Sequence, residues 1–338
     1  MNFINILNHI LRPLEWVVAQ LLTLSHHALV AFGMTAGPSP AWGIAIMCLV
    51  LVIRICLLPL FLSQMRAMQR IQVLQPQIQR IQHKYAARKD PRSKEAMQRE
   101  IMALQQRHNA NPLGSCLPSL IQAPILCSLF YTLQSLPAIA DGNAEPLGGI
   151  DHAMAGDIES SSIFGVRIAD SFGTVASPQS RIIIGVAVAL MCLTLFAIQW
   201  MLIHRNTSKD AMASPQFRVQ KMTVFVFPAI YVVSGATLPF GVLLYWLTNN
   251  LWNLGQTLCQ LRWFPTPGSA AGERKARRDH EQDNRRRAAA GLPSLEEERA
   301  MAAREDAKAR REREKSAASR NRKQHKTPHL AKRSIVKR

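Results

Sequence analysis

The residue with the clearest chemical consequence in this chain is Arg54, because it is the single charge in the apolar stretch 41–62. A stretch of that length crosses a bilayer as a helix. The polar edge begins at Ser63, about 14 Å away along a helix, which is farther than a guanidinium reaches by snorkelling. A charge at membrane depth is costly unless it faces a protein interior or a water-filled cavity. The sequence therefore predicts that Arg54 belongs to a functional site.

Amide and hydroxyl side chains lie at membrane depth in the later apolar stretches: Gln122, Gln199, Thr248, Asn249, Asn250, Asn253 and Gln256. Taken singly, each is explained by interhelical hydrogen bonds worth under about 1 kcal/mol. Taken with Arg54, they can line one hydrated concavity. The apolar stretches contain no Asp or Glu, so we expect the counter-ion of Arg54 to arrive on a ligand. The predicted groove residues are Arg54, Gln122, Gln199, Asn250 and Gln256.

Other kinds of site chemistry find no support in the sequence. The six cysteines all fall in apolar stretches, so neither a disulfide framework nor a metal site is indicated. His83 and His204 are isolated, and the sequence has neither a nucleotide-binding motif nor an intramembrane Ser-His-Asp set. We therefore predict no catalytic residue, no metal and no cofactor, and we do not expect an enzyme.

Five apolar helices must position the groove residues. The predicted fold class is an all-α polytopic membrane protein with a five-helix transmembrane core. The first three spans are expected at 41–62, 113–139 and 182–203, and the fourth and fifth form a tight hairpin within 222–261.

The charges of the connecting segments orient these spans. The segment 63–112 holds ten Lys/Arg and three acids, and the loop 204–221 is also basic. The loop 140–181 is acidic, with six acids and one Arg before position 181. By the positive-inside rule, the basic segments and the C-terminus are cytoplasmic, and the acidic loop and the N-terminus lie outside.

Residues 1–40 carry apolar side chains at helical spacing, interrupted by charges and histidines, without a secretory signature. This pattern favours an amphipathic helix on the outer face of the membrane. The alternative is a sixth span over about 15–34, which would place Met1 inside.

The cytoplasmic segment 63–112 is expected to form an antiparallel helical hairpin. Its first helix should bend near Pro76. Asp90 can cap the second helix, with Pro91 in the first helical position, and Asn111-Pro112 can begin the second span in the same way. The hairpin is either a solvated connector or a partner surface, and the residues of that partner surface would be Met68, Leu74, Pro76 and Met97.

Several stretches resemble the YidC/Oxa-type membrane protein insertases, especially actinobacterial members. One is Leu-Leu-Pro-Leu-Phe-Leu-Ser-Gln at 57–64, directly after the intramembrane arginine. The most specific is Asn-Pro-Leu-Gly-Ser-Cys-Leu-Pro-Ser-Leu-Ile-Gln-Ala-Pro-Ile at 111–125, in which Ser115 stands where the family signature often has Gly. The resemblance covers about residues 8–262, and the large outer domain of Gram-negative members is absent.

The resemblance implies a function for the predicted groove. Family members insert nascent membrane proteins into the bacterial plasma membrane, alone or beside the Sec translocon, through a hydrophilic groove open to the cytoplasm and the lipid. Arg54 corresponds to the groove arginine, which attracts polar parts of the incoming chain. Signal recognition particle machinery and ribosomes are further implied partners. The alternative is a small-solute transporter or channel with Arg54 as an anion site, although the five spans show no obvious inverted repeat.

The segment 262–338 is a basic tail, with 23 Lys/Arg and 11 acids in a chain whose net charge is +19. We expect it to be largely disordered, with a charged helix in part. It could contact anionic lipid or the ribosome. No aromatic residue follows Phe264, so we expect no specific DNA binding. The predicted contact residues are Arg285, Arg286, Arg287, Arg310 and Arg311.

Overall fold

The structure is a computed structural model that describes residues 3–88, 90–108, 110, 117–212 and 215–326. The fold is all-α, as predicted, apart from one two-stranded sheet in the described residues. The chain divides into a helical bundle, Met1–Glu273, and a C-terminal unit, Arg274–Arg338. The predicted start of the second span at Asn111-Pro112 and the first part of the 111–125 signature, residues 111–116, lie outside the described residues.

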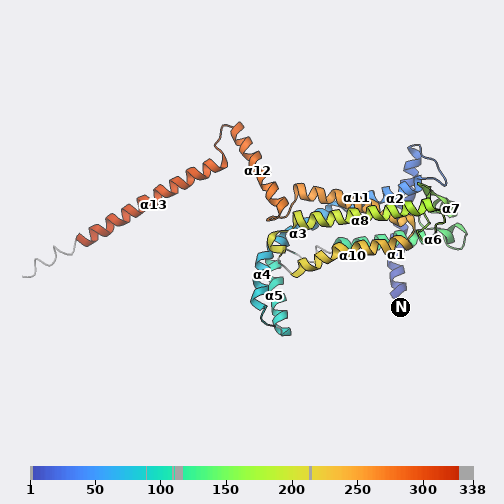
Figure 1. Cartoon of the computed structure of the whole chain (residues 1–338), viewed down its shortest axis with the longest axis horizontal. Coiled ribbons are helices and arrows are strands. Elements are labelled where there is room, and N and C mark those ends of the chain that lie inside the picture. Colours follow the sequence, from blue (N-terminus) through green and yellow to red (C-terminus); the bar gives the residue numbers. More distant parts are fainter. Residues whose placement is uncertain (1–2, 89, 109, 111–116, 213–214, 327–338) are drawn as a thin grey trace, which may run out of the picture. The chain divides into compact units, whose positions relative to one another are not determined.

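The long helices of the bundle lie side by side in Figure 1, where α11 packs against α8 and α2, and α10 packs against α8. They are α2 (Ala41–Cys56), α3 (Leu58–Val73), α6 (Leu117–Ala140), α8 (Pro178–Asn206), α10 (Pro215–Thr237) and α11 (Phe240–Trp263). Buried Trp42, Leu129 and Tyr245 belong to one core between α2, α6 and α11, and a second core packs α8 and α10 against α11.

Two helices in the described residues are long and apolar enough to cross a membrane, namely α8 and the part of α6 from Gln122. A third is added if α2 and α3 form one span, bent by 55° at Leu57. Pro59 explains the bend, because proline cannot donate to the carbonyl four residues earlier and its ring displaces that carbonyl. Helix α10 begins with cations and α11 carries several amides, so neither is counted among the helices that are apolar enough to cross a membrane. The count of five spans stays a prediction.

Helix α1 (Phe3–Ala31) packs against α2 and α6. In Figure 1 it runs across the direction of the bundle helices. Val18, Ala19 and Leu22 of α1 are buried in the same core as Trp42. This helix is not among the span candidates found in the described residues. The interfacial placement and the sixth span both remain predictions about the membrane, which the structure does not contain.

A helical hairpin extends from one end of the bundle (Figure 1). It continues α3 through α4 (Gln75–Tyr85), which has Pro76 in its second position, and returns as α5 (Pro91–Arg107). The Asp90 carboxylate accepts a hydrogen bond from Ser93 N at 2.8 Å, which lowers the pKa of Asp90 and caps α5 as its spacing predicts. Lys84 and Glu100 form an exposed ion pair at 2.9 Å between the two arms, and the pKa of Glu100 is lowered by it.

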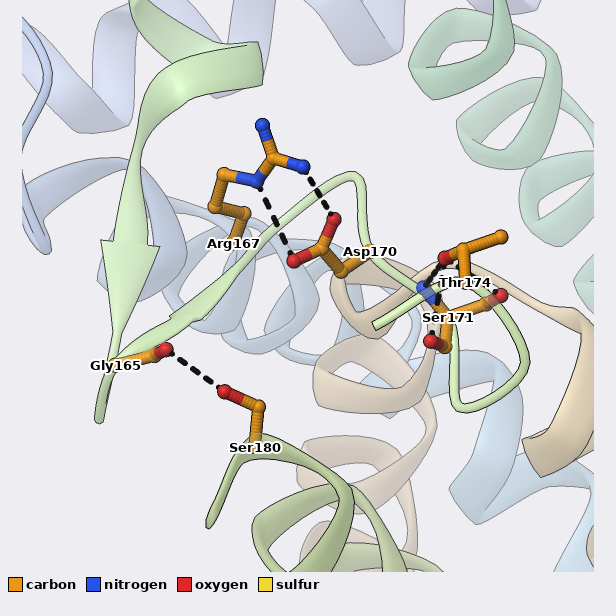
Figure 2. Close-up of polar contacts among 6 residues, drawn as sticks. All are labelled: Gly165, Arg167, Asp170, Ser171, Thr174 and Ser180. Carbon is orange, nitrogen blue, oxygen red and sulfur yellow. Dashed lines mark hydrogen bonds and ion pairs between the residues drawn. The ribbon is translucent and has the colours of Figure 1, made fainter. Parts of the chain in front are cut away.

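A cap segment, residues 141–177, covers the other end of the bundle. It contains α7 (His152–Ser160) and an antiparallel pair, β1 (Ser162–Ile163) and β2 (Val166–Arg167). Figure 2 shows how its turns are held: Arg167 pairs with the Asp170 carboxylate at 2.9 Å, and Ser171 N donates to Thr174 Oγ1 at 2.9 Å. Ser180 Oγ, at the start of α8, donates to Gly165 O at 3.1 Å.

The cap segment also completes the start of α11. Phe240 N donates to Asp170 O at 2.7 Å, and Gly241 N donates to Ile168 O at 2.9 Å. The first N–H groups of a helix have no partner within the helix, so these carbonyls supply acceptors that would otherwise be missing. Ile168 is fully buried against the bundle. The cap segment is therefore part of the fold at this end, rather than a loose connection.

The described part of the C-terminal unit is mostly helical, whereas the sequence predicts a largely disordered tail. Helix α12 (Ala270–Ala289) leads into it, and α13 (Leu295–Lys326) follows. Ser294 and Glu297 form a reciprocal capping box that starts α13, with Ser294 N donating to Glu297 Oε2 at 2.9 Å. This bond lowers the pKa of Glu297. Pairs spaced i,i+4, such as Arg310 with Glu314, add support along the exposed helix.

Candidate functional site

Arg54, on α2, is half-buried and hydrogen-bonded to α11. Its Nε donates to Asn249 Oδ1 at 2.9 Å, and its Nη2 donates to the same oxygen. Among the described residues no carboxylate pairs with Arg54. An amide oxygen orients the guanidinium without cancelling its charge. The charge therefore stays available to an anionic group that enters from outside the chain.

Gln122, on α6, extends this cluster by donating a hydrogen bond to the hydroxyl of Tyr245. Tyr245 lies on α11 one turn before Asn249 and is 2% exposed. Residues four apart share a face of a helix, so Tyr245 lies on the face of α11 from which Asn249 contacts Arg54. Three helices thus meet in one polar cluster, which we call the Arg54 cluster: Arg54, Gln122, Tyr245 and Asn249.

The other predicted groove residues lie elsewhere. Asn250 accepts a hydrogen bond from the Tyr231 hydroxyl on α10 at 3.3 Å, on a different face of α11 from Asn249. Gln199, on α8, donates to Thr223 Oγ1 of α10 at 3.4 Å. The structure therefore brings Gln122 to Arg54 but places Gln199 and Asn250 at the contact of α10 with its neighbours.

Gln256 lines a separate cavity of 600 Å³ between α11 and the bent pair α2–α3. The walls of this cavity are mostly apolar, with Leu58, Phe61 and Met65 on one side and Trp252 on the other. It shares no lining residue with the Arg54 cluster. Whether any of the five predicted residues touches a client stays a prediction.

One of the predicted partner residues of the hairpin is buried, and the other three are exposed or partly exposed. Leu74 is 3% exposed and packs inside the hairpin with Ile78 and Ala110. Met68 lines a cavity at the base of the hairpin, while Pro76 and Met97 are partly exposed on α4 and α5. Leu74 therefore stabilises the hairpin, and in this structure it is covered.

The end of α11 is tied to the base of the hairpin and to the end of α8. We call this the junction segment, residues 264–269. Gln69 Nε2 donates to Phe264 O at 2.5 Å, and Thr266 N donates to Asn206 Oδ1 at 2.9 Å. Ser269 also pairs with Ser208 in an isolated bridge just before the short helix α9 (Lys209–Met212). Thr266 and Ser269 are both 1% exposed, so the junction is a packed part of the bundle.

The predicted contact arginines of the tail differ in whether other residues of the chain already bind them. Arg287 is engaged within the C-terminal unit, donating to Pro293 O at 2.7 Å and pairing with Glu298. Arg310 pairs with Glu314 at 3.3 Å. Arg285, Arg286, Arg310 and Arg311 are exposed, and among these four Arg285, Arg286 and Arg311 have no ion pair within the described residues.

Sequence reasoning did not place Tyr245, Tyr231 or Asn249 among the site residues. The two tyrosines are aromatic residues in apolar stretches, and their only signal was a hydroxyl at membrane depth, where a buried O–H usually finds a partner. Asn249 was noted with Asn250, but composition does not tell which of two adjacent amides faces α2.

No group of three His, Cys, Asp or Glu side chains suited to a metal occurs in the part of the chain that the structure describes. The described cysteines Cys48, Cys56, Cys127, Cys192 and Cys259 are free.

Comparisons with known proteins agree on one family. Residues 34–266 match the family model of the 60Kd inner membrane protein. A protein of Bifidobacterium longum named Membrane protein insertase YidC is 44% identical over 307 residues, covering 90% of this chain and 91% of that protein. A protein of the same name from Streptomyces avermitilis is 34% identical over 77% of this chain and 59% of its own length. Another, from Tropheryma whipplei, is 30% identical over 80% of this chain and 90% of its own.

Proposed function

The chain belongs to the 60Kd inner membrane protein family, the YidC/Oxa-type membrane protein insertases, and on that premise we propose that it handles its clients at the Arg54 cluster. It is a membrane protein insertase that acts on nascent membrane proteins, and its activity is not enzymatic. Membership in this family does not favour a small-solute transporter.

The observation that carries the proposal is the uncompensated charge of Arg54. A guanidinium held by the neutral Asn249 oxygen keeps its affinity for a carboxylate or a polar backbone. The acidic or polar part of a client would dock there transiently. Such docking offsets part of the cost of bringing that part into the membrane.

Burial of the client's apolar segment in lipid would then drive release. Each Å² of apolar surface removed from water contributes roughly 25 cal/mol. The chemistry is noncovalent throughout. On release, the client's polar part leaves Arg54 and is hydrated on the outer side of the membrane. Strong, permanent binding at Arg54 would oppose this step, which is consistent with an arginine that has no fixed carboxylate in the described structure.

For the membrane arrangement, we propose five spans: α2 with the start of α3, α6, α8, α10 and α11. The hairpin α3–α5, the loop before α10 and the C-terminal unit would lie in the cytoplasm, and α1 with the cap segment would lie on the outer face of the plasma membrane. The basic composition of 63–112 and the acidic cap segment support this orientation.

The partners proposed for the cytoplasmic parts follow from charge. Arg285, Arg286 and Arg311 are suited to anionic lipid or ribosomal RNA, because both present phosphates. The Sec translocon and signal recognition particle machinery are proposed as co-workers on family grounds. Co-sedimentation with ribosomes, compared between the full chain and a triple Arg→Gln variant at these positions, tests the ribosome contact; unchanged binding would remove it.

The main experiment is reconstitution in liposomes with a single-span client that carries an acidic outer tail, using protease protection as the readout. Arg54→Ala should lower insertion of this client by about tenfold, Arg54→Lys should retain most of it, and a neutral-tailed client should depend less on the charge. Arg66→Ala, which removes an exposed cation of α3, is the matched control. Equal insertion of the acidic client by wild type and Arg54→Ala would overturn the role of Arg54.

A further inference from the structure

A second cavity, of 370 Å³, lies at the base of the hairpin, where α3 and α4 meet the ends of α8, α10 and α11. We propose that this amide cavity binds an extended, uncharged stretch of the client's backbone next to its apolar segment. The proposal rests on the insertase function and adds a binding site to it. The amides that line the cavity are Gln64, Gln72, Gln75, Asn206, Gln220 and Gln260.

The lining matches a peptide backbone by chemistry. Each side-chain amide offers an acceptor oxygen and an N–H donor, and each residue of an extended backbone offers one acceptor and one donor. Backbone recognition of this kind is independent of side-chain identity, as an insertase with many clients requires. The described side chains that line the cavity carry no charge, so neither acidic nor basic segments are favoured.

One of these amides has an oxygen without a hydrogen-bond donor. The Oε1 atom of Gln72 is buried and accepts no hydrogen bond from the described residues. A buried acceptor without a donor costs about 1–3 kcal/mol. Rotation of the Gln72 side chain into the cavity it lines would bring this oxygen to a backbone N–H of the client, which would supply the donor. By contrast, the Asn206 oxygen already accepts a hydrogen bond from Thr266 N, which holds the Asn206 side chain in place in the cavity wall.

The apolar part of the wall is adaptable. Met65 and Met68 of α3 and Phe217 of α10 are part of the lining. Methionine has a flexible, polarizable side chain that repacks around different shapes. A wall of this composition accommodates varied client side chains while the amides hold the backbone.

The amide cavity continues into the apolar cavity described above. Phe61, Met65 and Gln260 line both. The volumes, 370 and 600 Å³, fall within the range of ligand-binding cavities, about 300–1,000 Å³. A neutral polar mouth followed by an apolar slot is the order that a client presents when an extended flank leads into an apolar segment.

A lipid headgroup fits this cavity less well than a peptide does. Phosphate binding calls for a cation in the wall. The cations of α3 closest in sequence, Arg66 and Arg70, line a different pocket with Gln69 and His108. A phosphate would therefore be directed to that pocket rather than to the amide cavity.

The first test places a photo-cross-linking residue at Met68, inside the cavity, or at Met102, exposed on α5 and outside it. The probe is a radiolabelled client stalled on the ribosome, with a neutral Gly/Ser/Asn flank beside its apolar segment. We expect cross-links at Met68 at least about fivefold above those at Met102. Equal labelling at the two sites would overturn the proposal, because it would indicate general contact with the hairpin.

The second test alters the amides. Gln72→Leu should lower the Met68 cross-link yield about five- to tenfold, because the backbone loses a polar partner. Gln77→Leu, an exposed position on α4 outside the lining, should leave the yield unchanged. Gln72→Glu and Gln72→Lys should lower the yield to a similar extent. Opposite effects of the two charges would overturn backbone recognition in favour of a charged ligand.

Insertion of the same client into liposomes by wild-type protein is measured alongside. If wild type inserts the client but gives no cross-link at Met68, the amide cavity proposal alone fails. If wild type does not insert it, the proposed function fails, and this proposal falls with it. The Met68 label in otherwise wild-type protein keeps the test valid even if a Gln72 variant does not fold.

Discussion

One side-chain oxygen of Asn249 accepts hydrogen bonds from two nitrogens of Arg54, although 195 positions separate the residues along the chain. The contact joins α2 to α11 and fixes where the guanidinium points. Because the acceptor is an amide and not a carboxylate, orientation is achieved without neutralisation. Holding a charge in place while leaving it unsatisfied is what a transient docking site requires.

Replacement of that amide by a carboxylate should therefore damage function while preserving the contact. Asn249→Asp gives Arg54 an internal counter-ion, which competes with the client's own acidic tail. We expect insertion of an acidic-tailed client to fall about tenfold, with a smaller effect on a neutral-tailed client. Protease protection in liposomes measures both. Equal insertion of the acidic client by Asn249→Asp and wild type would contradict the docking role.

The bond between Gln122 and Tyr245 should contribute to stability. Tyr245→Phe and Gln122→Leu should each lower the free energy of unfolding by about 1 kcal/mol, and the double variant should lose less than the sum. Denaturation in detergent, analysed as a double-mutant cycle, gives the coupling energy. Tyr131→Phe, at a tyrosine that is 39% exposed, is the control. Strict additivity of the two losses would show that the bond is not formed.

The close fit of the cap segment should make Gly241 intolerant of a side chain. A Cβ there would lie 2.7 Å from Ile168 Cγ2 and 3.0 Å from Leu133 Cδ1. Gly241→Ala should destabilise the protein by about 1–3 kcal/mol, because the packed wall must shift. Gly185→Ala is the matched control: it is also helical, with nothing within 4 Å of the added atom. The control should be neutral or slightly stabilising, and similar losses in both variants would refute the proposed packing.

His26 should make the stability of α1 depend on pH. It is 5% exposed, stacks on Trp42 with ring centroids 3.7 Å apart, and neither ring nitrogen has a hydrogen-bond partner in the described residues. Burial lowers the pKa of His26, His27 lowers it further, and Asp157 acts in the opposite direction.

Because its folded pKa is below the ordinary value of about 6.5, the unfolded state takes up the proton more readily. Stability should be full above about pH 6.5 and should fall as the pH drops toward the folded pKa. Thermal unfolding between pH 7.5 and 5.5 measures this dependence. His26→Phe should flatten it and His27→Gln should not; a pH dependence retained in His26→Phe would assign it to another group.

The sequence predicted the parts of the site that depend on residue type and missed those that depend on direction. A lone arginine in an apolar stretch can be recognised from the sequence, and so can the capping pattern of Asp90 and Pro91. Adjacent residues of a helix point about 100° apart, so the choice between Asn249 and Asn250 required knowing which of them faces Arg54 of α2 and which faces Tyr231 of α10.

Two further features escaped prediction for different reasons. The start of α11 is completed by backbone carbonyls of Ile168 and Asp170, which leave no trace in side-chain pattern. The bend at Leu57 had a signal in Pro59, but the surrounding apolar residues continue to position 62 and favour one straight span. Apolar length predicts that a segment enters the membrane and says little about its direction.

The junction segment has a mechanical consequence. Phe264 is held by Gln69 of α3, and Thr266 by Asn206 at the end of α8, so the chain leaves α11 through two anchors. A pull on the C-terminal unit is therefore shared among three helices instead of unwinding α11 from its end. All three of those helices, α3, α8 and α11, border the amide cavity. Tension applied to the C-terminal unit would thus reach the wall of the cavity without passing through the Arg54 cluster.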